Sequence, residues 1–397
     1  MERKKIGMGL DAKKTDRRNL ILLAIAKYIS GFASYIYDVG IVIYLFSSTQ
    51  SVEIIGGFFV SQLLPAIIIL FTGKVIDTHS KKKLLAAANL LKSVIFVMLL
   101  FSRNIWVIYA VTFLMNLILE FESNTLNAFM VNAFSKDRLL KTSSIINLLD
   151  SASLLIAPTV AALIAMKFQI QINIFIVIIL FLFVAVCYLF IETSGVNEAN
   201  ISQETESQND WKDILKDRNV IKTIVYWNIF MLCIGLAAPL EISMIEDTLG
   251  MPSAYYGFGN TVEGVGMVLA SVFILGIIRK MKPMYIISIG LFSAAASYLM
   301  IGISQNIWMY FVGACLVGMT ATFCPLGFKT EIQMKCDPAT VGRTFTIGRF
   351  TILLSRAFGS LVVGKILLFA DIRVVYYGIC GILLAEALWY KRYRKKI

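Results

Sequence analysis

Charged residues are scarce in this sequence. Only 16% of the 397 residues are charged and 58% are hydrophobic, whereas a soluble globular domain carries about 25% charged residues. Apolar runs of about twenty residues recur along the chain, and a helix of that length crosses the ~30 Å hydrocarbon layer of a bilayer. The runs lack the short alternating segments of a membrane β-barrel. The composition therefore excludes a soluble protein and predicts an all-α polytopic membrane protein.

Metal-ligating residue types are also rare. The chain has one histidine, His79, and its six cysteines stand singly, so we expect neither a zinc site nor a disulfide framework. The segment 359–366 resembles a phosphate-binding loop, but it lacks the final Ser or Thr and lies inside an apolar run. We therefore expect no metal, no cofactor and no enzymatic activity, and we expect a proton gradient rather than ATP to supply the energy.

A net charge of +12 could indicate a nucleic-acid partner. Here the basic residues flank the apolar runs, where membrane topology alone accounts for them. The expected partners are therefore the lipid bilayer and a small-molecule substrate, with no nucleic acid. No further interface is required, so we expect a monomer.

The apolar runs predict twelve transmembrane helices arranged as two six-helix bundles. The only long polar stretch, 192–219, has the composition of a linker and separates them. The predicted parts are an N-terminal tail 1–19, a first bundle 20–191, the linker, a second bundle 220–390 and a C-terminal tail 391–397. The predicted spans are 20–46, 54–73, 84–102, 105–132, 143–166, 170–191, 220–245, 255–278, 283–303, 307–332, 343–369 and 372–390.

Lysine and arginine orient these spans. The loop 73–83 contains four lysines, and short cytoplasmic loops collect such residues. If successive spans cross the membrane in opposite directions from this loop, the only lysines and arginines in the predicted outer loops are Arg103, Lys167 and Arg373. The segment 1–19 lacks the apolar core of a signal peptide. We therefore predict both termini in the cytoplasm and a multi-pass protein of the plasma membrane, with a composition typical of a bacterium.

The fourth span carries a polar stripe. Asn116, Glu120, Asn124 and Asn127 are spaced by 4, 4 and 3 residues, which places them on one helix face. An ionised carboxylate at mid-bilayer costs roughly 3 kcal/mol or more, so we expect the stripe to face an aqueous cavity. Burial would make Glu120 a proton acceptor. The alternative is a hydrogen-bond network that packs the helix against its neighbours.

Other charged residues lie within spans. Asp38 shares a face of the first span with Lys27, three turns earlier, and Glu241 lies near the outer end of the seventh. Arg356 in the eleventh span shares a face with Arg349. We predict that Asp38, Glu241 and Arg356 contribute to the same cavity. The arginines could instead pair with carboxylates of other spans.

The loop between the second and third spans resembles the signature of the major facilitator superfamily, G-x-x-x-D-[RK]-x-G-[RK]-[RK]. Thr78 and Ser80 depart from it; the residues that match are Gly73, Asp77, Lys81 and Lys82. The resemblance implies the two-bundle transporter fold and a cytoplasmic latch, in which Asp77 meets the N-terminus of the eleventh span near Arg343. A helix N-terminus stabilises a carboxylate. The alternative is a solvated basic loop.

The fifth span resembles the exporter motif G-x-x-x-G-P-x-x-G-G of the same family. Pro158 is retained, and small residues replace the glycines at Ser153, Ala157 and Ala161. The motif implies exchange of substrate for protons, and the wider sequence is similar to macrolide-efflux-like exporters. The alternative is a small-residue packing interface kinked by proline. The fourth span lacks the arginine that many family antiporters carry, so a relay built on it is not expected.

These features predict a secondary active transporter that alternates access between its two halves and exports an amphipathic small molecule by proton coupling. A lipid, lysolipid or anionic metabolite carrier, including one for uptake, is the alternative within transport. A non-transporting receptor or scaffold is the alternative of another class. A scaffold has no evident use for charges inside four spans.

Overall fold

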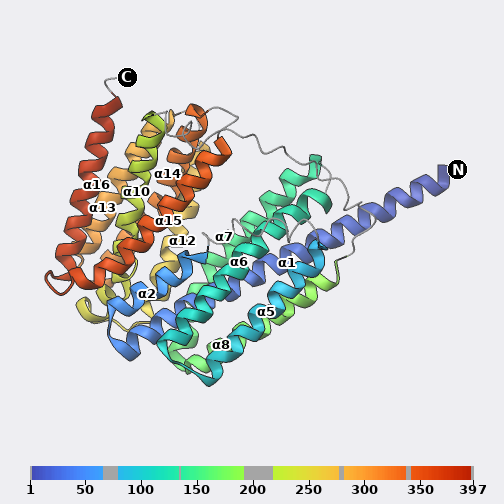
Figure 1. The fold of residues 1–397 in the computed structure, drawn as a ribbon, viewed down its shortest axis with the longest axis horizontal. Helices are drawn as coiled ribbons and strands as arrows, with labels where there is room; N and C mark the ends of the chain where they lie inside the picture. Colours follow the sequence, from blue (N-terminus) through green and yellow to red (C-terminus); the bar gives the residue numbers. More distant parts are fainter. Residues whose placement is uncertain are drawn as a thin grey trace. The chain divides into compact units, whose positions relative to one another are not determined.

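A computed structural model describes residues 2–65, 79–133, 136–191, 218–276, 281–336 and 341–394. Within these ranges the regular structure is helical (Figure 1). Ten of the described helices are long and apolar enough to cross a membrane, and two shorter apolar helices, Val52–Leu63 and Ala152–Lys167, lie where the remaining predicted spans were expected. The predicted all-α polytopic fold is confirmed.

The chain divides into two compact units. The first comprises Met1–Gly40 and Pro65–Thr205, and the second comprises Ile41–Leu64 and Glu206–Ile397. The first unit contains most of α1 (Glu2–Thr49), followed by α5 (Lys81–Phe101), α6 (Ile105–Ala133), α7 (Lys136–Lys167) and α8 (Ile170–Leu189). The second contains α2 (Val52–Leu63), α10 (Arg218–Ala237), α11 (Leu240–Ser243), η2 (Met244–Thr248), α12 (Tyr255–Gly276), α13 (Pro283–Ile303), α14 (Ile307–Lys335), α15 (Val341–Ile366) and α16 (Ile372–Arg394).

The seventh span differs from the prediction. A continuous helix over 220–245 was expected, but α10 ends at Ala237 and the short helices α11 and η2 follow. Pro239 precedes α11, and proline has no backbone N–H to continue the hydrogen-bond ladder of a helix. The break sets Glu241 on a separate short helix rather than on the last turn of α10.

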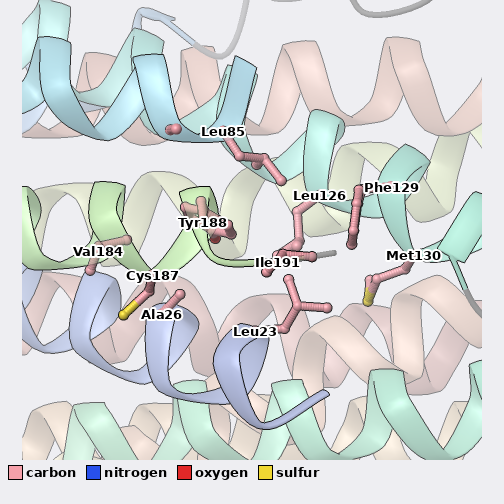
Figure 2. Close-up of a cluster of buried hydrophobic side chains, with 11 residues drawn as sticks. Leu23, Ala26, Leu85, Leu126, Phe129, Met130, Val184, Cys187, Tyr188 and Ile191 are labelled. Atoms are coloured by element: carbon pink, nitrogen blue, oxygen red, sulfur yellow. The ribbon is translucent and has the colours of Figure 1, made fainter. Parts of the chain in front are cut away.

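The core of the first unit is formed by α1, α5, α6 and α8. Leu23 and Ala26 of α1 meet Tyr188 of α8 in one buried cluster (Figure 2). Leu85 of α5 and Leu126 of α6 complete its sides. This packing determines which sides of the four helices face one another. It therefore also determines where the polar groups of the same unit lie.

Glycines bring the helices of the second unit into close contact. A Cβ on Gly318 of α14 would lie 1.9 Å from the backbone oxygen of Glu263 in α12, and one on Gly266 would lie 2.0 Å from that of Cys315. A Cβ on Gly235 of α10 would lie 2.1 Å from the oxygen of Arg356 in α15. Small residues at such crossings allow the close backbone approach that membrane helices use to associate.

Replacing Gly318 with alanine is expected to destabilise the protein by about 1–3 kcal/mol, because the added methyl group must push α14 away from α12. Gly378 of α16 is the matched control, since a Cβ there would meet nothing within 4 Å. The fraction of purified protein that stays monodisperse after heating measures the difference. Equal heat sensitivity of Gly318→Ala and Gly378→Ala would contradict the close crossing.

Candidate functional site

A pocket of about 200 Å³ lies in the first unit between α1 and α6. The residues that α1 contributes follow an i, i+3, i+4 pattern and so occupy one helix face. Those from α6 follow the same pattern. The lining residues are Lys27, Ser30, Gly31, Ser34, Tyr35 and Asp38 from α1, and Met115, Asn116, Leu119, Glu122, Ser123 and Leu126 from α6.

The lining is amphipathic. Asp38 and Asn116, both predicted for a cavity, line this pocket together with Lys27. Lys27 and Asp38 are eleven residues apart, so a helix separates them by about 16 Å along its axis. Met115 and Leu119 of α6 add apolar side chains to the lining. The pocket therefore offers both charges and an apolar wall.

A buried ion pair lies beside the pocket. The Nζ atom of Lys92, on α5, is 2.6 Å from Oε2 of Glu122. Oε1 of Glu122 accepts hydrogen bonds from Asn89 Nδ2 at 2.9 Å and from the Tyr188 hydroxyl at 3.2 Å. Lys92 also donates to Ser30 Oγ at 3.3 Å. Glu122 thus accepts three hydrogen bonds from protein side chains. The positive charge of Lys92 balances its negative charge at the edge of the pocket.

Aromatic rings surround this ion pair. The Lys92 ammonium lies 4.2 Å from the centre of the Phe181 ring, and Phe181 stacks on Phe96 at 5.6 Å. The face of an aromatic ring attracts a cation. The next ring, Tyr37, packs edge-on against Phe96 at 4.6 Å and hydrogen-bonds to Thr112 at 2.6 Å. These contacts tie α1, α5, α6 and α8 together around a charge pair that the sequence analysis did not single out.

The predicted stripe on α6 is divided by the structure. Asn116 lines the pocket, whereas the half-buried Glu120 and the exposed Asn124 are not among the lining residues. The side chain of Asn127 lies outside the described part. Two residues along a helix turn by about 200°, so Glu120 and Glu122 point in nearly opposite directions. The role of Glu120 as a proton acceptor stays a prediction.

A second group of charges lies in the second unit. Glu241 lies on α11, Glu263 on α12 and Arg356 on α15. All three side chains are half-buried. Glu241 and Arg356 were predicted cavity residues; neither lines the pocket of the first unit, and their role in a cavity stays a prediction.

The predicted latch falls largely outside the described residues. Gly73 and Asp77 lie in the segment 66–78, which the structure does not describe, and the same holds for the side chain of Arg343 in α15. Lys81 begins α5 and is 3% exposed, and Lys82 follows it. The latch therefore stays a prediction.

The exporter-like motif lies on α7. Ser153 donates hydrogen bonds to the backbone oxygens of Tyr28 at 2.9 Å and Leu149 at 3.1 Å. Ala157 and Ala161 have no exposed surface, and Pro158 is buried within the helix. The hydrogen bond from Ser153 to Tyr28 joins α7 to α1, which fits the packing interpretation. The inference of export from this motif stays a prediction.

Long apolar helices in two compact units, with charged side chains held inside them, are typical of a multi-pass membrane protein. Residues 23–242 match the Major Facilitator Superfamily, over more than half of the chain. The chain belongs to this family of membrane transporters. Family membership implies a small-molecule substrate and a protein embedded in the membrane.

Relatives and solved structures agree with this assignment. The chain is 23% identical to the uncharacterized MFS-type transporter YkuC of Bacillus subtilis, over 94% of this chain and 91% of that protein. It is also 23% identical to macrolide efflux protein A of Streptococcus pyogenes, over 86% of this chain and 87% of that one. The crystal structure of the nucleoside transporter NupG has a TM-score of 0.75 at 13% identity, and the match covers 94% of this chain and 98% of that one. This last likeness concerns the fold.

Proposed function

We propose that this transporter exports an amphipathic small molecule in exchange for protons. The observation that carries the proposal is the pocket between α1 and α6, whose lining combines the charged Lys27 and Asp38 with apolar residues of α6. A molecule with a charged or polar group and an apolar body matches such a lining. Binding sites for small molecules are generally apolar clefts with a few placed polar groups.

Two further features support export. One curated relative is a macrolide efflux protein, and macrolides are large amphipathic molecules. The fifth predicted span carries the exporter-like motif around Pro158, in which serine and alanine replace the glycines. A lipid or anionic metabolite carrier remains the alternative, because Lys27 in the pocket would suit a phosphate or carboxylate group.

Transport in proteoliposomes tests the proposal. Radiolabelled erythromycin and the amphipathic cation ethidium are the probes, with a pH gradient imposed across the membrane. We expect gradient-driven accumulation of at least one probe, and its loss when a protonophore is added. Equal movement with and without the gradient would overturn proton coupling, and movement of neither probe would overturn the proposed substrate class.

Replacing Asp38 with asparagine is expected to lower the initial transport rate of a cationic probe by about tenfold, mainly by raising KM. The loss of one charge-assisted contact of about 1.4 kcal/mol corresponds to a factor of ten. Asp371→Asn is the matched control, because Asp371 is exposed before α16 and accepts a hydrogen bond from the Arg373 backbone. Equal rates for the two variants would remove Asp38 from the binding pocket.

A further inference from the structure

The helix α5 begins with a lysine that is buried without a partner. Lys81, its first residue, is 3% exposed, and the Nζ atom has no hydrogen-bond partner in the described structure. Lysine is almost never fully buried unless it is paired, because an uncompensated charge away from water is strongly unfavourable. The surroundings of Lys81 therefore lack a negatively charged group that the described residues do not supply.

A second buried lysine of the same helix shows what is missing. Lys92 follows Lys81 by eleven residues, or about three helical turns, so both lie on one face of α5. Lys92 lies 2.6 Å from Glu122 and also donates a hydrogen bond to Ser30. Among the described residues, the ammonium group of Lys81 has no such contact. The protein therefore neutralises one buried lysine of this face and leaves the other to be neutralised by a ligand.

The position of Lys81 explains its burial and the direction of its side chain. Leu85, one turn later on the same face, packs with Leu23 and Ile191 in the core cluster of the first unit (Figure 2). Side chains of a helix lean toward its N-terminus, so Lys81 extends this face beyond Leu85 to the end of the helix. Its aliphatic stem continues the apolar packing, and its ammonium group is directed toward the helix N-terminus.

The first turn of α5 offers further donors to an anion. Residues 81–83 are three lysines and the turn has no acidic residue, although the partial positive charge of a helix N-terminus favours carboxylates and disfavours lysines. The N-cap side chain of Ser80 accepts no hydrogen bond from this turn, so the first backbone N–H groups have no acceptor in the helix or its cap. Membrane topology explains lysines in a loop, but solvated lysines suffice for it. It does not explain why Lys81 is buried.

We propose that the N-terminal turn of α5 binds a phosphate group, with the Lys81 ammonium as its counter-charge and the backbone N–H groups as hydrogen-bond donors. Free N–H groups and the helix dipole make a helix N-terminus a phosphate site, and lysine binds phosphate as a point charge. α5 is long and apolar enough to cross a membrane, so its first turn lies at the level of the lipid headgroups. The phosphate can therefore belong to an anionic lipid or be free in solution. The site does not depend on the proposed export.

Thermal unfolding of the delipidated full chain in detergent tests the site. The two probes are dioleoylphosphatidylglycerol and inorganic phosphate. Dioleoylglycerol, which has the same acyl chains without a phosphate, is the control for the lipid, and sodium chloride at matched ionic strength is the control for free phosphate. Lys81→Met removes the buried charge and keeps an unbranched apolar side chain. Lys83→Met is the matched variant, because Lys83 lies in the same turn and is exposed.

We expect at least one probe to raise the unfolding temperature, because a ligand that binds only the folded protein stabilises it. In Lys81→Met the concentration for half-maximal stabilisation should rise about tenfold or more, the effect of losing one charge-assisted contact. In Lys83→Met it should change by less than about twofold. Without any probe, Lys81→Met should unfold at a higher temperature than the unmodified chain, because an unpaired buried charge has been removed. Lys92→Met, which removes a paired lysine, should unfold at a lower one.

The two probes distinguish the sources of the phosphate. Stabilisation that depends on Lys81 and is seen only with phosphatidylglycerol assigns a lipid headgroup, whereas the same dependence with inorganic phosphate assigns a phosphate that needs no lipid. Equal half-maximal concentrations in Lys81→Met and Lys83→Met would overturn the proposal, as would stabilisation by neither probe or equal stabilisation by dioleoylglycerol. A lower unfolding temperature of Lys81→Met without any probe would also contradict it, because the ammonium group would then have a partner within the protein.

Discussion

Replacing Lys92 with methionine is expected to lower the stability of the folded protein by about 3–5 kcal/mol, the usual effect of removing one member of a buried ion pair. Lys92 has no exposed surface, and its partner Glu122 is 5% exposed. Without Lys92, Glu122 keeps the hydrogen bonds from Asn89 and Tyr188 but loses the cation that lies 2.6 Å away. The carboxylate must then be buried with its charge or take up a proton.

A double variant separates pairing from packing. Lys92→Met combined with Glu122→Met removes both charges and keeps similar side-chain volumes, so most of the lost stability should return. Lys167→Met, at an exposed position of α7, is the control for loss of a lysine. Thermal aggregation of the purified variants, followed by size-exclusion chromatography, ranks their heat stability. If Lys92→Met resists heat as well as Lys167→Met does, the ion pair is not structural.

The sequence did not reveal this ion pair because it is a tertiary feature. The run 84–102 reads as one apolar span despite Lys92, and Glu122 lies beside the more regular stripe of Asn116 and Glu120. Helical spacing says which residues of one helix share a face, but it does not say which helix that face meets. The sequence did contain one indication of the pair: a lysine and a glutamate lie inside two neighbouring apolar spans, and each needs a partner there.

The spans themselves were largely predictable, because about twenty apolar residues between polar loops leave few alternatives. The ninth predicted span, 283–303, coincides with α13, whose Pro283 stands at the favoured first helical position. The break after Ala237 was missed, since a hydrophobic run continues through Pro239. Local backbone chemistry, rather than hydropathy, decides where such a helix ends.

The packing partner of helix α2 could not be predicted from the order of the spans along the chain. Its residues belong to the predicted first bundle, yet Ile41–Leu64 falls in the second compact unit. A Cβ on Gly56 would lie 2.1 Å from the backbone oxygen of Ser360, and one on Gly364 would lie 2.8 Å from the Cβ of Glu53. α2 therefore packs directly on α15, and only small residues permit this contact.

Linking α2 to α15 by a disulfide is expected to abolish transport, and a reductant is expected to restore it. If access alternates by movement between the predicted bundles, α2 must leave α15 once in each cycle, and a covalent link prevents this. Glu53→Cys with Gly364→Cys suits the link, because the 2.8 Å separation of their Cβ positions is about 1 Å below the mean for disulfides. Mass spectrometry of the joined peptides verifies the bond, and each single cysteine variant is a control for the native thiols. Undiminished erythromycin or ethidium transport by a fully crosslinked sample would mean that α2 and α15 stay together throughout the cycle, and the moving halves would then be the two compact units rather than the two bundles predicted from the sequence.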